Sequence, residues 1–137
     1  MGCVIMQNGG PISWFSVLDK TVALSTCEAE INAAVMAAKD AIHIGRLMFD
    51  LTLKDEESSI QIAEENSAAI AQAASGIRAV RKAKHYEVRL RFLQELVVQK
   101  AIEFVYCPTD IQLAELLTKP LLPDRHTTLT SSLLFSV

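Results

Sequence analysis

The chain has 137 residues, enough for one ordinary domain, and half of them are apolar, so a substantial core is possible. The net charge of −3 argues mildly against a nucleic-acid binder. Three widely spaced cysteines without a C-x-x-C pair argue against disulfides or a zinc site and favour a reducing compartment. Without a signal peptide or a membrane-spanning apolar run, we expect a cytoplasmic or nuclear protein with no membrane partner.

The N-terminal third predicts a β-hairpin followed by a long helix. Apolar runs at residues 3–6 and 12–17 flank the turn-forming residues 8–11, Asn-Gly-Gly-Pro. Ser25 and Glu28 then form a capping-box pattern, and apolar residues recur at helical spacing through about residue 53. A polar cluster at residues 54–59 ends this helix.

The remaining elements alternate between strand and helix. We predict a strand at residues 60–62, helices at 67–74 and 83–99, and a strand at 102–106. Residues 109–112 form a second capping-box pattern and predict a helix that ends at Pro120. The Thr/Ser/Leu-rich residues 122–137 are expected to form a poorly ordered tail. The order indicates an α/β domain with a mixed sheet flanked by helices.

Basic residues gather in one short segment despite the negative total charge. A local basic stripe matters more to phosphate contact than net charge does, and the competing interpretation is a solvated helix face. The candidate nucleic-acid-binding residues are Arg78, Arg81, Lys82, Lys84, His85 and Arg89.

Five segments, the first of them in the predicted hairpin, carry a family resemblance. They are GGPISW at 9–14, TVALSTCEAE at 21–30, EENSAAI at 64–70, KHYEVR at 84–89 and PTDIQLAELLTKPL at 108–121. In this order they resemble the ribonuclease H-like domain that ends copia-type retrotransposon polyproteins. Several ordered motifs are more specific than any one of them. The resemblance implies a truncated RNase H-like fold over residues 1–121.

The resemblance also implies an activity, namely cleavage of the RNA strand of RNA–DNA hybrids. Such enzymes hold two Mg²⁺ (or Mn²⁺) ions with four carboxylates, and two ions about 4 Å apart stabilise the attacking and leaving oxygens. The implied partners are an RNA–DNA hybrid or other nucleic acid, with a reverse transcriptase domain or a second copy of the chain as further candidates.

Carried over by position, the catalytic and metal-binding carboxylates are Glu30, Glu65 and Glu115. Glu28 is the rival of Glu30, but its capping-box position gives it a local structural role. The family has Asp where this chain has Glu65 and Glu115, and each change adds about 1.5 Å of reach. Because misplacement by about 1 Å can cost on the order of 100-fold in rate, we expect impaired catalysis.

The fourth ligand of the family lies on a central first strand that precedes the segment matched here. We therefore expect an N-terminally truncated fold in which the hairpin and the strand at 60–62 lack their shared neighbour. A gap, a rearranged pairing, a strand from another chain or an unstable product would follow. Three hypotheses stay open at this stage: a nuclease, a non-catalytic remnant that binds nucleic acid or protein, and an unfolded fragment.

Overall fold

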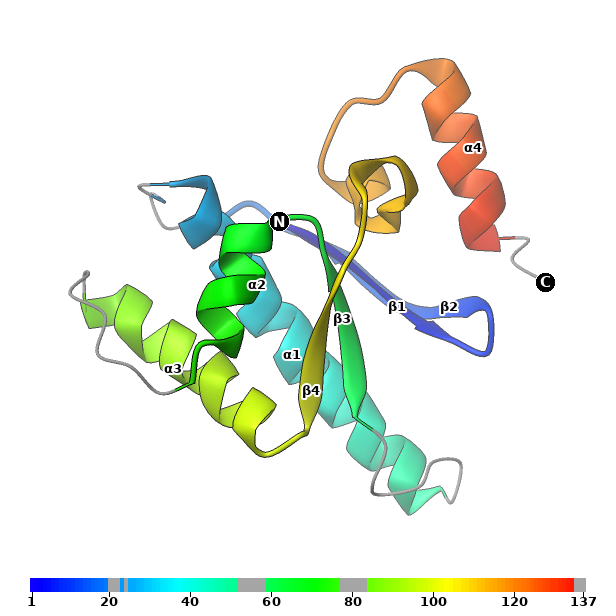
Figure 1. Cartoon of the computed structure of the whole chain (residues 1–137). Helices are drawn as coiled ribbons and strands as arrows, with labels where there is room; N and C mark the ends of the chain where they lie inside the picture. The colour runs from blue at the N-terminus through cyan, green and yellow to red at the C-terminus, as the bar shows by residue number, and fades with distance from the viewer. Residues whose placement is uncertain (20–22, 24, 52–58, 77–83, 135–137) are drawn as a thin grey trace.

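The computed structural model of the chain describes residues 1–19, 23, 25–51, 59–76 and 84–134, and these form a mixed α/β structure (Figure 1). In chain order the elements are β1 (Gly2–Gln7), β2 (Gly10–Ser16), α1 (Thr26–Asp50), β3 (Ile60–Glu64), α2 (Ser67–Ala74), α3 (Lys84–Val98), β4 (Ile102–Tyr106), the 3₁₀ helices η1 (Thr109–Ile111) and η2 (Leu113–Leu117), and α4 (Pro123–Leu134). Among the described helices, none combines the length and apolar character that crossing a membrane requires.

The predicted hairpin is confirmed, and its turn has the expected chemistry. β1 and β2 are antiparallel, and Gln7 pairs with Gly10 across a two-residue loop. Asn8 and Gly9 have φ values of 50° and 79°. Positive φ at both positions is the requirement of a type I′ turn, whose twist matches that of the flanking strands.

β3 and β4 form a parallel pair with α2 and α3 in the connection between them. Their register runs from Ile60 opposite Ile102 to Glu64 opposite Tyr106. Parallel neighbours need a crossover, which the two helices supply. The strands and helices that the sequence predicts in this region are confirmed.

Side-chain caps explain where two helices begin. Ser25 Oγ accepts a hydrogen bond from the backbone N–H of Glu28 at 3.2 Å at the start of α1. Asn66 Oδ1 accepts bonds from the N–H groups of Ala68 and Ala69 at 3.0 and 3.1 Å at the start of α2. Each cap satisfies donors that the first helical turn leaves without a partner.

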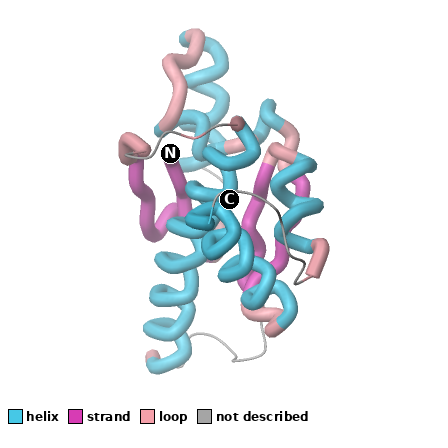
Figure 2. Tube along the Cα trace, turned by 90° about the vertical axis from the view of Figure 1, so that its left-hand side faces the viewer, coloured by secondary structure: helices cyan, strands magenta, loops and turns pink. Residues whose placement is uncertain are grey.

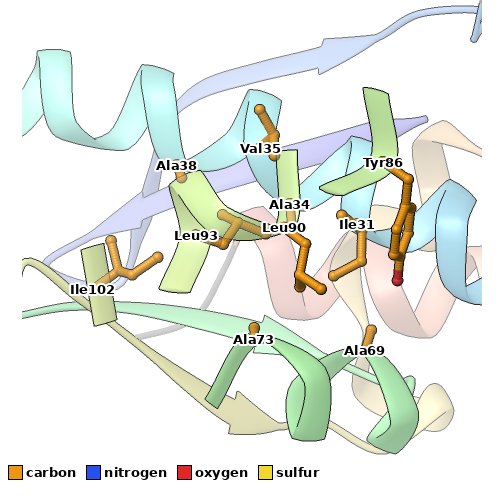
Figure 3. Packing of buried hydrophobic residues seen from close by; sticks show 10 residues of the cluster. All are labelled: Ile31, Ala34, Val35, Ala38, Ala69, Ala73, Tyr86, Leu90, Leu93 and Ile102. Atoms are coloured by element: carbon orange, nitrogen blue, oxygen red, sulfur yellow. The ribbon is translucent and has the colours of Figure 1, made fainter. Parts of the chain in front are cut away.

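The main core lies where α1, α2 and α3 meet the parallel strand pair (Figure 3). One face of α1 enters it with small and branched side chains, and α3 adds larger ones. Its buried residues are Ile31, Ala34, Val35, Ala38, Ala69, Ala73, Tyr86, Leu90, Leu93 and Ile102. The small residues of α2 allow its backbone to approach the neighbouring elements closely.

The four described strands form two separate two-stranded sheets, β1–β2 and β3–β4. Figure 2 shows the two strand pairs set apart in the molecule. This agrees with the expected gap between the hairpin and the strand at 60–62. The α/β class is therefore correct at the coarse level, whereas a single mixed sheet is not formed by the described strands.

The prediction of one continuous helix from residue 109 to Pro120 is wrong. The segment forms η1 and η2 instead, and no side chain caps η1 at Pro108. Gln112 interrupts the helical path with φ −72° and ψ 101°, and its side-chain amide donates to the Ala63 carbonyl at 3.1 Å. A tertiary hydrogen bond to β3 thus outweighs the local capping pattern.

The expectation of a poorly ordered tail is also wrong for residues 123–134, which form α4. Pro123 begins this helix, a position where its missing N–H has no cost. Leu129 is 1% exposed, and α4 contacts η2 and β2. Arg125 also donates to the Thr109 carbonyl at 2.7 Å, so a buried apolar side chain and a polar bond hold this helix.

Replacing Leu93 by alanine should lower the free energy of unfolding by about 2–5 kcal/mol, because the side chain is fully buried and its loss leaves a cavity. Urea denaturation followed by circular dichroism measures the change. Val98→Ala at the exposed end of the same helix is the matched control and should shift stability by less than about 0.5 kcal/mol. Equal effects of the two substitutions would contradict the packing described for α3.

Candidate functional site

A groove of about 790 Å³ lies between the two sheets. β1 forms one wall, β3 forms the other, and α1 contributes the floor. Small α1 residues, among them Ala33, Ala37 and Gly45, line this floor. The size is within the range of ligand pockets, so the groove is the candidate site of the described structure.

Carboxylates from three parts of the chain gather along this groove. Glu30 comes from α1, Glu64 and Glu65 from the end of β3, and Glu115 from η2, and all four line it. Burial raises the pKa of Glu30, and the nearby charge of Glu65 raises it further. The structure therefore brings together the three carboxylates Glu30, Glu65 and Glu115 that the resemblance singled out. Glu28, the rival of Glu30, is not among the lining residues.

Glu115 is buried and fully engaged by two cations. Lys119 Nζ lies 2.6 Å from Glu115 Oε1, and Arg125 pairs with Oε2. Burial raises the pKa of Glu115, but the hydrogen bonds from Lys119 and Arg125 outweigh it and hold the pKa below its ordinary value. Glu115 is thus an ionised carboxylate whose two oxygens already have positively charged partners.

Lys119 connects Glu115 to Glu65. Its ammonium lies 3.6 Å from Glu65 Oε1, and the bond to Glu115 raises the pKa of Lys119. Glu65 Oε2 is buried and has no hydrogen-bond partner within the described part of the chain. Glu65 therefore has one oxygen that is neither exposed nor hydrogen-bonded within the described residues.

Glu64 is a buried acid that the sequence analysis did not single out. It is 7% exposed, and its Oε1 accepts the N–H of Asn66 at 2.8 Å. Burial raises its pKa to about 7, with the charges of Glu30 and Glu65 acting in the same direction. Its position as the last residue of an alternating strand, before the helix-capping Asn66, is the only signal that sequence offers.

The carboxylates do not fit the two-metal site that the resemblance implies. Within the described residues, no three His, Cys, Asp or Glu side chains converge to hold a metal ion. Both oxygens of Glu115 are taken by Lys119 and Arg125, and Glu64 is held by Asn66. Mg²⁺ needs several oxygen ligands in near-octahedral geometry, which this arrangement does not supply.

Three of the candidate nucleic-acid-binding residues are described, Lys84, His85 and Arg89, and none of the three lines the groove. Lys84 and His85 are exposed in the first turn of α3. Arg89 is half-buried and donates to Asn32 Oδ1 at 2.6 Å, so it has a structural partner inside the protein. The other three candidates, Arg78, Arg81 and Lys82, lie outside the described residues.

Glu64→Gln should change how stability depends on pH. An acid whose pKa rises to about 7 on folding contributes stability below about pH 4.5, and loses it as the pH rises through about 7. The amide stays neutral and keeps an acceptor for the Asn66 N–H, so the variant should be more stable than wild type at pH 8 by roughly 1–3 kcal/mol. Urea denaturation at pH 5 and pH 8 tests this.

The control for this experiment is Glu95→Gln, at an exposed position of α3. Its stability difference from wild type should be the same at both pH values. If Glu64→Gln behaves like Glu95→Gln, the carboxyl of Glu64 is not in the buried environment described above.

Comparison with known proteins finds a relative among transposon polyproteins. The chain is 33% identical over 118 residues to a protein described as "Retrovirus-related Pol polyprotein from transposon TNT 1-94" from Nicotiana tabacum. The alignment covers 86% of this chain but 9% of that protein, so the chain spans about a tenth of the relative's length. No family model and no solved structure matches. The chain is therefore similar to a part of a retrotransposon polyprotein, and this relationship supports a transposon-derived origin.

Proposed function

We propose that this chain is the RNase H-like domain of a retrotransposon-derived polyprotein, and that it has lost most of its metal-dependent cleavage of RNA–DNA hybrids. The ordered motifs and the similarity to a transposon polyprotein support the ancestry. The gathering of Glu30, Glu65 and Glu115 along one groove is consistent with it. The loss of cleavage rests on a separate observation.

That observation is the position of Lys119. Its ammonium lies between Glu65 and Glu115, the two residues that are each one methylene longer than their counterparts in the family. A divalent ion at these carboxylates would have to displace charge-assisted hydrogen bonds, each contributing about 1.5–3 kcal/mol. Such a cost lowers metal affinity by roughly 10-fold to 100-fold per bond.

A non-catalytic role in nucleic-acid binding is the second candidate function. The exposed Lys84 and His85 lie at the start of α3, and basic residues immediately precede them in the sequence. Such residues hold backbone phosphates without distinguishing sequence, and binding weakens steeply with salt. Arg89 contributes less in this proposal because Asn32 already accepts its hydrogen bond.

The protein should show little cleavage of a labelled RNA–DNA hybrid with Mg²⁺ or Mn²⁺. Lys119→Met removes the ammonium while keeping a long side chain, so it should free oxygens of Glu65 and Glu115 and raise Mn²⁺ affinity by about tenfold. Calorimetric titration with Mn²⁺ measures the affinity, and gel analysis of the hybrid measures cleavage.

Lys100→Met, at an exposed position after α3, is the matched control and should leave Mn²⁺ affinity unchanged. Robust cleavage by the wild-type protein that disappears in Glu30→Gln would overturn the proposed loss of activity. Unchanged Mn²⁺ affinity in Lys119→Met would remove the physical reason given for it.

Charge reversal at Arg81, Lys82 and Lys84 together should weaken binding of the hybrid by at least about tenfold at low salt and flatten the salt dependence. Fluorescence anisotropy over a series of salt concentrations measures both quantities. Arg46→Glu, at an exposed position of α1, is the control for charge reversal outside the basic segment, and Lys84→Glu alone is the single substitution of equal charge change to compare with it. Equal affinities of the triple variant and wild type would rule out this basic segment as the binding surface.

A further inference from the structure

Helix α4 lies against the segment that carries Glu115, and its attachment to the rest of the protein is narrow. It contacts η2 and β2, and Leu129 is its buried residue. Figure 1 shows it set apart from α1, α2 and α3. We propose that α4 is a detachable strap, which occupies one oxygen of Glu115 when it is docked and makes that oxygen available to a cation when it is released. This inference rests on the proposed function in one respect, namely that Glu30, Glu65 and Glu115 are the remains of a cation site.

Arg125 is the contact between α4 and the carboxylates. Its guanidinium pairs with Glu115 Oε2 and donates to the Thr109 carbonyl at 2.7 Å. Glu115 is only 4% exposed, yet no described residue of α4 lines the groove. Helix α4 therefore takes up a carboxylate oxygen of the site without entering the groove. Docking of α4 and binding of a cation compete for this oxygen.

The docked state of α4 carries a local cost. Arg125 Nε is buried and has no hydrogen-bond partner among the described residues. Burying an N–H donor without an acceptor destabilises the state in which it is buried. The further ion pair of Arg125 with Asp110, at 3.4 Å, contributes little because the Asp110 side chain is 90% exposed. Release of α4 would return Arg125 Nε to water and remove this cost.

The sequence of α4 makes it a weak helix on its own. Five of its 12 residues are serine or threonine, whose hydroxyls compete for backbone hydrogen bonds. The hydroxyls of Thr127, Thr128 and Ser132 each donate to the carbonyl four residues earlier. Isolated helices of this length are marginal in water even when they are rich in alanine. Helix α4 is therefore helical because it is docked, and its release is a local unfolding that leaves the α1–α3 core intact.

Docking of α4 and cation binding are linked by thermodynamics. A substitution that weakens docking raises cation affinity, and a bound cation weakens docking by the same factor. Leu129 is the residue that separates this effect from simple electrostatics, because it is apolar and does not line the groove. Leu129→Ala loosens α4 and leaves every charge beside Glu115 in place, whereas Arg125→Met also removes a positive charge.

Hydrogen exchange of the full chain, followed by mass spectrometry without metal, tests the release of α4. Peptides from residues 123–134 should exchange faster than peptides from residues 84–98 in the wild-type protein. Leu129→Ala should speed exchange in α4 by at least about tenfold and leave α3 unchanged. Leu134→Ala, at the exposed end of α4, is the matched control and should change neither. Equal exchange of α4 and α3 in the wild type and in Leu129→Ala would overturn the proposal, because α4 would then open only with the whole protein.

Calorimetric titration with Mn²⁺ tests the link to the carboxylates. Leu129→Ala should bind Mn²⁺ at least about fivefold more tightly than wild type, and Leu134→Ala should bind it equally. Saturating Mn²⁺ should in turn speed hydrogen exchange in α4 of the wild-type protein and leave α3 unchanged. If Leu129→Ala does not fold, this effect of Mn²⁺ on the wild type decides the question alone, and its absence would overturn the proposal.

The variant Lys119→Met separates this inference from the proposed function. Higher Mn²⁺ affinity in Lys119→Met together with unchanged affinity in Leu129→Ala would overturn the strap and leave the proposed role of Lys119 intact. The reverse result would support the strap and remove that role. No gain in either variant would overturn both.

Discussion

Helix α1 has two faces to cover, and the structure covers them unequally. Ile31 and Ala38 on one face are fully buried against α2, α3 and the parallel strands. The other face carries alanines and a glycine and forms the floor of the groove. Burying apolar surface stabilises a fold because it removes that surface from water. The second face of α1 is only partly buried, and β1, β3 and η2 surround it.

The hairpin lies across this groove from β3, yet it is attached elsewhere. An added Cβ on Gly2 would lie 2.7 Å from Thr118 Cγ2, so β1 approaches η2 as closely as a glycine permits. Ser16 Oγ donates to the Leu117 carbonyl at 2.6 Å, which fixes β2 to the same segment. The position of the hairpin thus depends on η2 and not on pairing with β3.

Sequence predicted the local elements well because their signals are local. The Asn8-Gly9 turn and the Ser25 cap each need only neighbouring residues, and each is present. Sequence patterns gave wrong predictions where contacts with residues far away in the chain determine the local structure. Gln112 leaves the helical path to bond with β3, and α4 is ordered by Leu129 and by the pairing of Arg125 with Glu115.

The candidate site shows the same limit. The resemblance identified Glu30, Glu65 and Glu115, and the three do line one groove. It did not identify Lys119, because its ion pair with Glu65 depends on the packing of η2 against the end of β3. The burial of Glu64 is equally non-local, since a glutamate at a strand end is exposed unless other elements cover it.

Glu115 therefore has a structural role that its position in the motif does not suggest. Through Lys119 it connects η2 to Glu65 at the end of β3, and through Arg125 it connects η2 to α4. Since η2 in turn contacts the hairpin, these ion pairs help to position the hairpin relative to β3. The ion pairs of Glu115 with Lys119 and Arg125 thus help to keep the groove between β1 and β3 in place.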